Sequence, residues 1–473
     1  MRGKSSPRRG PNGRTPKKTP DTFRDAFLTA RDVELQGLVD RFLSGEQDAP
    51  TVLNVEGLVR AALYQTGARV VAVMFQAVAD RVDAAYRPRA GEHLKQRESI
   101  QIQCLFGSFV LERNYYWSAT RGGHCPADEA LGLEAGHSPS LVRLACLEGA
   151  DETSFEKAQR HLEETGGIAM DSRQIQRLVQ RVGPTLQAWP EREEEPPDAT
   201  PAPIPILYVS ADGTGIPMRK EELLGRKGKQ PDGKSKTRQV YLGCVFTQHK
   251  TDGLGRPVRD WESTTYVASM QNVDAFGPLL RNEAIRRGMG NAVRQVFIVD
   301  GASGLEAMGR INFKDAIQIV DFYHAMEHAG LVLAALPGGK AHPDYKHRLR
   351  KWAKRLLRNG VANLVADARK ECAGQPCAPA VEEQLHYFES NVERMQYGTF
   401  RKNGFFIGSG VVEAGCKTVV GQRCKQSGMF WSQSGAEHVL ALRAIHASRQ
   451  INGFWKFRLE QCLAPSNPIQ TPA

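Results

Sequence analysis

Hydrophobic and polar positions follow two different periods along the chain, and the changes of period separate its parts. Within residues 23–98, apolar side chains recur every three or four positions, as at Leu35, Leu38, Val39 and Phe42. That spacing places them on one face of a helix. The pattern therefore predicts a helical region over this part of the chain.

The period changes to two in the next segment, residues 99–140. Ile100 and Ile102 alternate with polar residues, the turn Phe106-Gly107-Ser108 follows, and alternation resumes through Leu111. Alternating runs on both sides of a short glycine-containing turn are typical of a β-hairpin. We expect this hairpin region to follow the helical one.

Residues 141–189 return to the helical period. A first helix, a turn at Gly167 and a second helix capped by Ser172 would form a helix-turn-helix-like unit. The exposed face of the second helix carries groups that suit phosphates and base edges. These candidate DNA-binding residues are Arg173, Gln174, Gln176, Arg177 and Arg181. The alternative is an ordinary helical hairpin with a solvated face.

Composition shifts abruptly over residues 190–205, which contain six prolines and a run of glutamates. Proline-rich segments are extended and stiff, so this segment is predicted to be a linker and a domain boundary.

Beyond the linker, strands and helices follow in the order β-β-β-α-β-α-β-α over residues 206–324. Three strands joined by loops favour antiparallel pairing, and the helical crossovers that follow require parallel pairing. A mixed five-stranded sheet covered by helices satisfies both, and this is the ribonuclease H-like order. The predicted strands are 206–210, 240–247, 263–269, 293–299 and 316–320, and the predicted helices between them are 273–287 and 304–310.

No strand pattern occurs in residues 325–404, which predicts a helical insertion in the core. Residues 405–458 would complete the core, with one long helix over 410–449. A capping box at Ser434 and Glu437 falls inside that helix. The fold class predicted for the chain is α+β with several domains.

Composition and charge narrow the class of partner. Among 473 residues, 63 Lys and Arg outnumber 52 Asp and Glu, for a net charge of +11. A basic tail, residues 1–22, adds to this excess, and residues 459–473 form a second tail. Such a balance favours a polyanionic partner, a class that includes double-stranded DNA.

Two further features concern the compartment. No run of about 18 apolar residues is present, so the sequence predicts no membrane span. Nine scattered cysteines indicate a reducing compartment rather than a disulfide scaffold. We expect a cytoplasmic, nucleoid-associated protein.

Two acidic residues end predicted strands that would be adjacent and parallel. Asp212 follows the first strand and Asp300 the fourth, and each precedes a glycine. Ligand sites in open α/β sheets lie at this edge, and paired carboxylates suit Mg²⁺ or Mn²⁺. An Asp-Gly pair can also simply form a turn after a strand.

A third carboxylate is expected on a helix beside these two. Glu413 lies at the start of the helix predicted after Gly408 and Gly410, off its buried face. Lys417, four residues later, could pair with Glu413 and need do no more than stabilise the helix.

Three segments together carry a family resemblance: Tyr208-Val209-Ser210-Ala211-Asp212-Gly213-Thr214, Val299-Asp300-Gly301-Ala302 and Gly408-Ser409-Gly410-Val411-Val412-Glu413. They resemble the acidic motifs of bacterial insertion-sequence DDE transposases of the Kra group. The stretch Arg423-Cys424-Lys425-Gln426-Ser427-Gly428-Met429-Phe430-Trp431-Ser432 is similar too. The resemblance covers most of the chain from about residue 99 to 447.

The resemblance implies a Mg²⁺-dependent DNA transposase with Asp212, Asp300 and Glu413 as catalytic residues and metal ligands. Two metal ions would support cleavage at element ends and strand transfer to a target without a covalent enzyme intermediate. Asp321 and His324 match an element that accompanies the site in related transposases, so a position near the site or near DNA is expected for them and for Lys417.

Zinc is the less favoured alternative. Asp321, His324 and His328 fall on one helix face, but no fourth soft ligand accompanies them. Cys104 and Cys125 do not form the cysteine pairs that the family often places near the hairpin.

Further basic residues are expected to contact DNA: Lys351, Lys354, Arg355 and Arg358 on one stripe of the insertion, and Arg423 and Lys425 after Glu413. A charged stripe can also be only a solvated face. Two rival functions remain, a ribonuclease H-like nuclease or resolvase, and a non-catalytic regulator derived from a transposase. Synapsis of two ends suggests a homo-oligomer in the DNA complex.

Overall fold

The computed structural model describes residues 54–189, 203–226 and 235–463, with a few residues between Asp25 and Ser44. The predictions for the basic tail, for most of the proline-rich linker and for residues 464–473 lie outside the described residues.

The chain divides into two compact units. The first comprises Met1–Leu144, Glu163–Ile168 and Arg458–Ala473. The second comprises Ala145–Leu162 and Ala169–Phe457. The predicted linker therefore connects two parts of the second unit.

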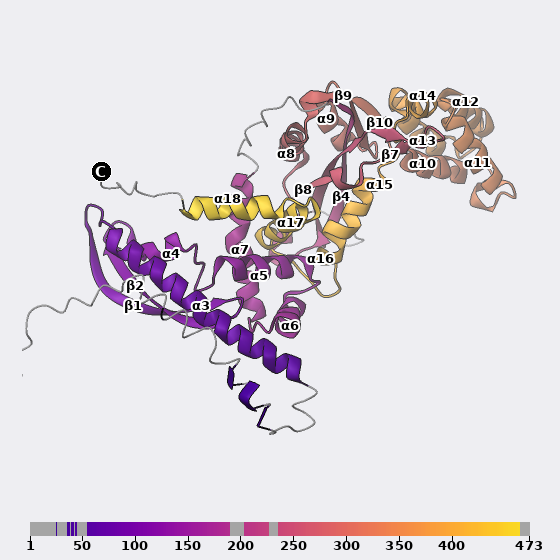
Figure 1. Ribbon diagram of the computed structural model, residues 1–473. Helices are drawn as coiled ribbons and strands as arrows, with labels where there is room; N and C mark the ends of the chain where they lie inside the picture. Colours follow the sequence, from indigo (N-terminus) through magenta and orange to yellow (C-terminus); the bar gives the residue numbers. More distant parts are fainter. Residues whose placement is uncertain are drawn as a thin grey trace, which may run out of the picture. The chain divides into compact units, whose positions relative to one another are not determined.

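A long helix and a β-hairpin make up most of the first unit (Figure 1). Its elements are α3 (Val55–Ala85), β1 (Glu92–Cys104), β2 (Gly107–Ser118), β3 (Gly122–His124) and α4 (Pro126–Ala130). The hairpin pairs Cys104 with Gly107, whose φ of 128° suits glycine at this tight turn. The inward-facing residues of β1 and β2, among them Ile102 and Leu111, pack with Ala79 of α3 in one apolar core. The predicted hairpin is confirmed.

Three helices follow: α5 (Pro139–Asp151), α6 (Phe155–Gly166) and α7 (Ser172–Ala188). Gly167 has a φ of 63°, as expected at the turn after α6. The predicted cap is wrong by one residue, because Asp171 and not Ser172 is the N-cap of α7. The Asp171 carboxylate accepts from the Arg173 amide at 2.8 Å, and the Gln174 side chain accepts from the Asp171 amide at 3.0 Å.

A mixed five-stranded sheet forms the centre of the second unit. Its strands are β4 (Ile204–Pro217), β5 (Thr237–Gln248), β8 (Thr265–Ser269), β9 (Ala292–Val299) and β10 (Ile317–Val320). They lie in the order β10-β9-β4-β5-β8, with β10, β9 and β4 parallel and β4, β5 and β8 antiparallel. The short strands β6 (Lys250–Thr251) and β7 (Pro257–Val258) form a separate ladder. The predicted five-stranded mixed sheet is confirmed.

The first strand of the sheet is longer than its apolar run predicts. The antiparallel ladder with β5 continues through Asp212, opposite Leu242, to Pro217, opposite Thr237. Asp212 therefore lies within β4, and Gly213 is a strand residue rather than a turn residue. The backbone hydrogen bonds supplied by β5 extend the strand beyond the apolar segment that the sequence marks.

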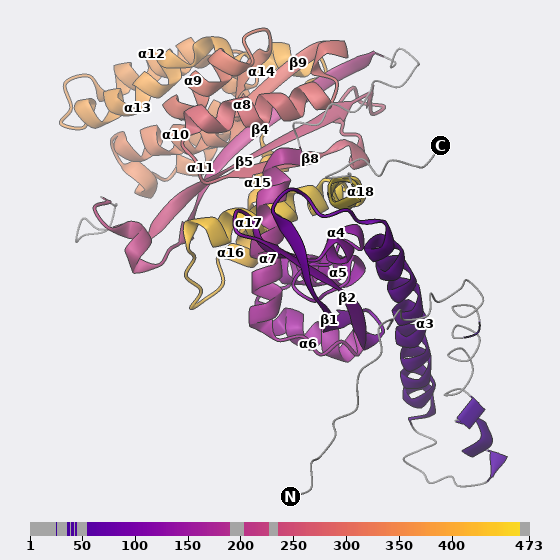
Figure 2. The same cartoon turned by 90° about the vertical axis from the view of Figure 1, so that its left-hand side faces the viewer.

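Helices cover both faces of this sheet (Figure 2). On one face, α8 (Val273–Arg286) and α9 (Ser303–Asn312) bury a core with Val209, Val245 and Phe297. On the other face lie α15 (Gly410–Gly415) and α17 (Gln433–Ala447), which contact β5 and β8. Because strand residues alternate between faces, Asp212 lies on the α15 face while its neighbour Ala211 joins the α8 core.

The predicted helical insertion is present beside β10 (Figure 1). It consists of α10 (Phe322–Ala335), α11 (Tyr345–Leu356), α12 (Val361–Cys372), α13 (Ala378–Ser390) and α14 (Tyr397–Lys402). The first of these helices, α10, is the last helix of the predicted β-β-β-α-β-α-β-α order, and the Asp321 side chain caps it by accepting from the His324 amide at 2.8 Å.

The single helix predicted over 410–449 is wrong. After α15 the chain forms a π-helical turn, Cys416–Gly421, then α16 (Gln422–Cys424), a loop, and α17. Gly428 in the loop has a φ of 75°, and the helix restarts where Ser432 accepts from the Gly435 amide at 3.2 Å. The predicted capping box at Ser434 is therefore two residues late.

A final helix, α18 (Ile451–Leu463), ends the described chain. Within the described residues, no helix has both the length and the apolar character that crossing a membrane requires.

Candidate active site

Asp212 and Asp300 lie at the same level of two adjacent parallel strands. The last pair in the β4–β9 ladder is Ser210 with Ile298, so each aspartate is two residues beyond it. Gly301 turns the chain after β9 with a φ of 84°, and the Asp300 carboxylate accepts from the Ala302 amide at 2.9 Å. The two acidic residues that the sequence singles out are thus brought together.

The Asp212 side chain is half-buried. It accepts from the Gly213 amide at 2.6 Å and from the Cys416 thiol. Burial raises the pKa of Asp212, and the charge of Asp300 raises it further, whereas both hydrogen bonds and His324 act in the opposite direction. The net result is a raised pKa, so the ionised form of Asp212 lacks a sufficient counter-charge.

Glu413 projects from the short helix α15. Its carboxylate accepts from the Ser409 hydroxyl at 2.9 Å. The helix packs closely on the sheet, because a Cβ on Gly415 would lie 2.6 Å from the Tyr266 ring and 2.9 Å from the Leu242 side chain. Glycine at this position lets α15 approach the strand face that carries Asp212.

Asp321 and His324 join this group. Asp321 is fully buried, and its second carboxylate oxygen accepts from the Ser409 amide. One potential ligand atom from each of Asp321, His324 and Glu413 lies within 4.8 Å of the other two. Asp321 therefore ties the start of α10 to the turn that precedes Glu413.

This group contains neither Asp212 nor Asp300, and Glu148, Glu152 and His161 form a second group with the same spacing among the residues that the structure describes. His324 connects the first group with Asp212, since its charge acts on that residue. Lys417 is exposed and, in the described part of the chain, forms no ion pair with Glu413.

His328 takes a different position from His324. Its ring stacks on Tyr387 with centroids 3.6 Å apart, and its Nδ1 lies 3.3 Å from the Gln384 side-chain oxygen. Burial lowers the pKa of His328, which favours its neutral form.

Two contacts at the site were not predicted from the sequence. The Tyr387 hydroxyl, from the helical insertion, donates to the Asp300 carbonyl at 3.1 Å. The Cys416 thiol donates to Asp212. No spacing signal marks Tyr387, whereas Cys416 is three residues from Glu413, one helical turn away.

The predicted DNA-contacting residues differ in exposure. On α7, Arg173, Arg177 and Arg181 are exposed, Gln174 is engaged in the capping box and Gln176 is half-buried. On and just after α11, Lys351, Lys354 and Arg358 are exposed, and Arg355 forms an ion pair with Asp367.

Arg423 is the clear exception. Its side chain is 0% exposed, donates to the carbonyls of Gly149 and Thr153, and lies against the rings of Phe155 and Trp431. The prediction that Arg423 contacts DNA is wrong, because its guanidinium is fully used inside the protein.

Lys425, two residues later, is exposed, and its ammonium donates to the Thr214 hydroxyl on β4. Thr214 is two residues beyond Asp212, so it lies on the same face of the strand. Lys425 therefore adds a positive charge near the carboxylates.

Comparisons with known proteins give one family and two individual similarities. Residues 49–236 match the model of an uncharacterised protein family, UPF0236. The chain is 25% identical over 375 residues to a "UPF0236 protein in vanSb 3′region" from Streptococcus gallolyticus, covering 74% of this chain and 73% of that protein.

Among solved structures, the Drosophila P element transposase strand transfer complex matches 70% of this chain and 82% of its own, with 11% identity and a TM-score of 0.26. A likeness at this TM-score does not establish a shared fold.

Proposed function

We propose that the protein is a DDE transposase, which cleaves DNA at the ends of an insertion sequence and joins them to a target. The observation that carries this proposal is that Asp212 and Asp300 lie at the same level of two adjacent parallel strands, two residues beyond the last pair of their ladder, with the Glu413 helix contacting β4. The strand order β10-β9-β4-β5-β8 supports the interpretation of the sheet as ribonuclease H-like, a class of domain in which such acids act. The three acids also lie in the motifs that resemble the Kra group.

The donor set suits a hard divalent cation, Mg²⁺ or Mn²⁺, held by Asp212, Asp300 and Glu413. Carboxylate oxygens are the preferred ligands of these ions. Burial and the charge of Asp300 raise the pKa of Asp212, and a bound cation would act in the opposite direction. Bound metal would lower the pKa of an attacking water or 3′-hydroxyl and stabilise the leaving oxygen. Zinc is not required by this donor set.

The chain's own residues would hold that set in place. Asp321 fixes the Ser409 amide, and the Ser409 hydroxyl then orients the Glu413 carboxylate. The Tyr387 hydroxyl fixes the backbone of Asp300. Lys425 would contact the phosphate backbone beside the reacting bond, since its ammonium lies next to β4.

Two exposed basic faces, which lie far along the chain from Asp212, Asp300 and Glu413, would bind DNA. The arginines of α7 have the arrangement of a recognition helix, and the basic residues of α11 suit backbone contact. The function requires two element ends to be handled together, and a homo-oligomer in the DNA complex follows from that requirement.

The test uses DNA from both sides of the coding region as candidate ends, with Mg²⁺ or EDTA. Asp300→Asn and Glu413→Gln should each lower cleavage by several orders of magnitude and change DNA affinity by less than threefold. Metal-dependent cutting without joining would favour a nuclease or resolvase. Binding without cleavage in Mg²⁺ would favour a regulator and would contradict the proposal.

A further inference from the structure

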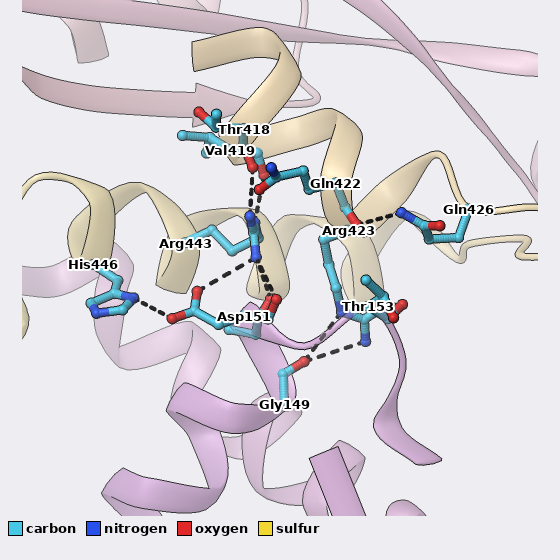
Figure 3. Close-up of polar contacts among 11 residues, drawn as sticks. Gly149, Asp151, Thr153, Thr418, Val419, Gln422, Arg423, Gln426, Arg443 and His446 are labelled. Carbon is cyan, nitrogen blue, oxygen red and sulfur yellow. Dashed lines mark hydrogen bonds and ion pairs between the residues drawn. The ribbon is translucent and has the colours of Figure 1, made fainter. Parts of the chain in front are cut away.

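Two buried arginines connect the segment after Glu413 to the end of α5 (Figure 3). Arg423 is 0% exposed and Arg443 is 8% exposed, and both belong to the second unit. A guanidinium removed from water must have its donors satisfied inside the protein, or burial is very costly. Their partners therefore show what the two side chains hold together.

Arg443, from α17, bridges two backbone segments. Its Nε donates to the Val419 carbonyl at 2.6 Å, and Nη2 donates to the Thr418 carbonyl at 2.5 Å. On the other side, Nη1 donates to the carbonyls of Ala150 at 2.8 Å and Asp151 at 3.2 Å. One guanidinium thus makes four backbone contacts.

The two carbonyls on the first side belong to the π-helical turn, Cys416–Gly421. A π turn is wider than an α turn, is uncommon, and needs support from its surroundings. Donation to two successive carbonyls supplies such support. The turn also matters for the site, because it begins with Cys416, which donates to Asp212, and directly follows the helix of Glu413.

The carbonyls on the second side lie at the end of α5. The C-terminus of a helix carries partial negative charge and unpaired carbonyls, so a cation is favourable there. The Asp151 carboxylate adds to this, lying 3.4 Å from Arg443 Nη1 and pairing with the His446 ring. The end of α5 is thus a fixed point against which Arg443 holds the π turn.

Arg423 offers a natural comparison. It donates to Gly149 of the same helix end at 3.3 Å, to Thr153 at 3.3 Å, and to the Met429 sulfur at 3.2 Å. None of these partners lies in the π turn. The two arginines therefore share burial and the α5 anchor, and differ in contact with the turn.

We propose that Arg443 is a positioning residue for the site: by holding the π turn, it sets the placement of Glu413 and Cys416 relative to Asp212. The consequence for metal binding and DNA joining rests on the proposed function. The hydrogen bonds from Arg443 to the π turn do not depend on the proposed function, and their effect on the turn can be measured separately.

The experiment compares Arg443→Lys with the matched control Arg423→Lys, each keeping the charge and losing the planar fork. Hydrogen exchange of the backbone amides of Cys416–Gly421 reports the hold on the turn. Arg443→Lys should raise that exchange at least tenfold more than Arg423→Lys does. Equal exchange in the wild type and Arg443→Lys overturns the inference, whatever the activity.

Metal binding and joining test the consequence for the site. For Arg443→Lys, the half-saturating Mn²⁺ concentration in a thermal-shift titration should rise at least fivefold, and the joining rate at saturating DNA should fall at least tenfold. DNA affinity should stay within twofold. Arg423→Lys should leave the Mn²⁺ titration within twofold of wild type, and an equal shift in both variants contradicts a specific role of Arg443.

A milder variant covers the case in which Arg443→Lys does not fold. Asp151→Asn removes the carboxylate beside Arg443 and leaves the backbone contacts, so it should raise exchange of the turn two- to fivefold; unchanged exchange overturns the inference. If the wild type neither binds Mn²⁺ nor joins DNA, the proposed function fails, while the exchange comparison still decides whether Arg443 holds the turn.

Discussion

Replacing Gly415 by alanine should separate catalysis from DNA binding, because it changes how closely the Glu413 helix approaches the sheet. The new Cβ would lie 2.6 Å from a Tyr266 ring carbon, where ordinary contacts begin at 3.4 Å. The helix must then move outward by about 0.8 Å, or the half-buried Tyr266 ring must shift. Overpacking of this kind costs about 1–3 kcal/mol of stability.

That displacement acts directly on Glu413, two residues away. A misplacement of about 1 Å in a catalytic group can cost on the order of 10²-fold in rate. We therefore expect Gly415→Ala to lower the joining rate about 30- to 100-fold, with DNA affinity within twofold. The stability loss should lower Tm by about 2–4 °C per kcal/mol.

The assay is a single-turnover joining reaction at saturating DNA, run below the melting temperature of the variant. Gly410→Ala is the matched control, since it lies in the same helix and its Cβ would meet nothing within 4 Å. It should keep activity within threefold. Full activity in Gly415→Ala, or an equal loss in Gly410→Ala, would refute the packing argument.

Three further predictions concern stability and DNA binding. Arg423→Met should lower the free energy of unfolding by about 2–4 kcal/mol, since it leaves buried carbonyls unpaired, and should not change the DNA affinity of the folded fraction; a selective loss of affinity would contradict its structural role. Alanine at Arg173 and Arg177 together should weaken DNA binding and reduce the slope of log K against log salt by up to about 2; an unchanged slope would mean that this face of α7 is only solvated. Burial raises the pKa of Glu92, but hydrogen bonds from Tyr86, His124 and a backbone amide outweigh it and lower the pKa to about 2. The charged carboxylate therefore stabilises the fold above about pH 4.5, and this contribution is lost as the pH falls towards 2. Glu92→Gln should cost about 1–3 kcal/mol at pH 7 and nothing near pH 2 in urea unfolding; a cost that does not depend on pH would refute the assignment.

Much of the fold follows from local patterns in the sequence. The hairpin turn at Gly107, the five strands of the sheet and the helices of the insertion all have an apolar period that a short window reveals. The position of Asp212 beside Asp300 also follows from the strand order, because the parallel ladder between their two strands ends just before both residues.

What the sequence could not reveal depends on contacts between distant segments. The extension of β4 past Asp212 comes from its pairing with β5, and the break after Glu413 comes from the π turn that Arg443 supports. Arg423 belongs to the stretch that resembles the Kra group, yet the backbone carbonyls that it binds, those of Gly149 and Thr153, are more than 200 positions away in the chain. Charge alone does not distinguish an exposed arginine from one that is paired inside the protein.

The central claim, metal-dependent cutting and joining at the carboxylates, is tested most directly by one comparison. Wild type and Asp212→Asn are incubated with DNA from the element ends and a target plasmid, in Mg²⁺ or EDTA, and joined products are counted by sequencing the junctions. We predict junctions in wild type with Mg²⁺, none above background with EDTA, and a loss of at least 10³-fold in Asp212→Asn with DNA affinity retained. Strand transfer by Asp212→Asn at a rate near that of wild type would contradict the claim.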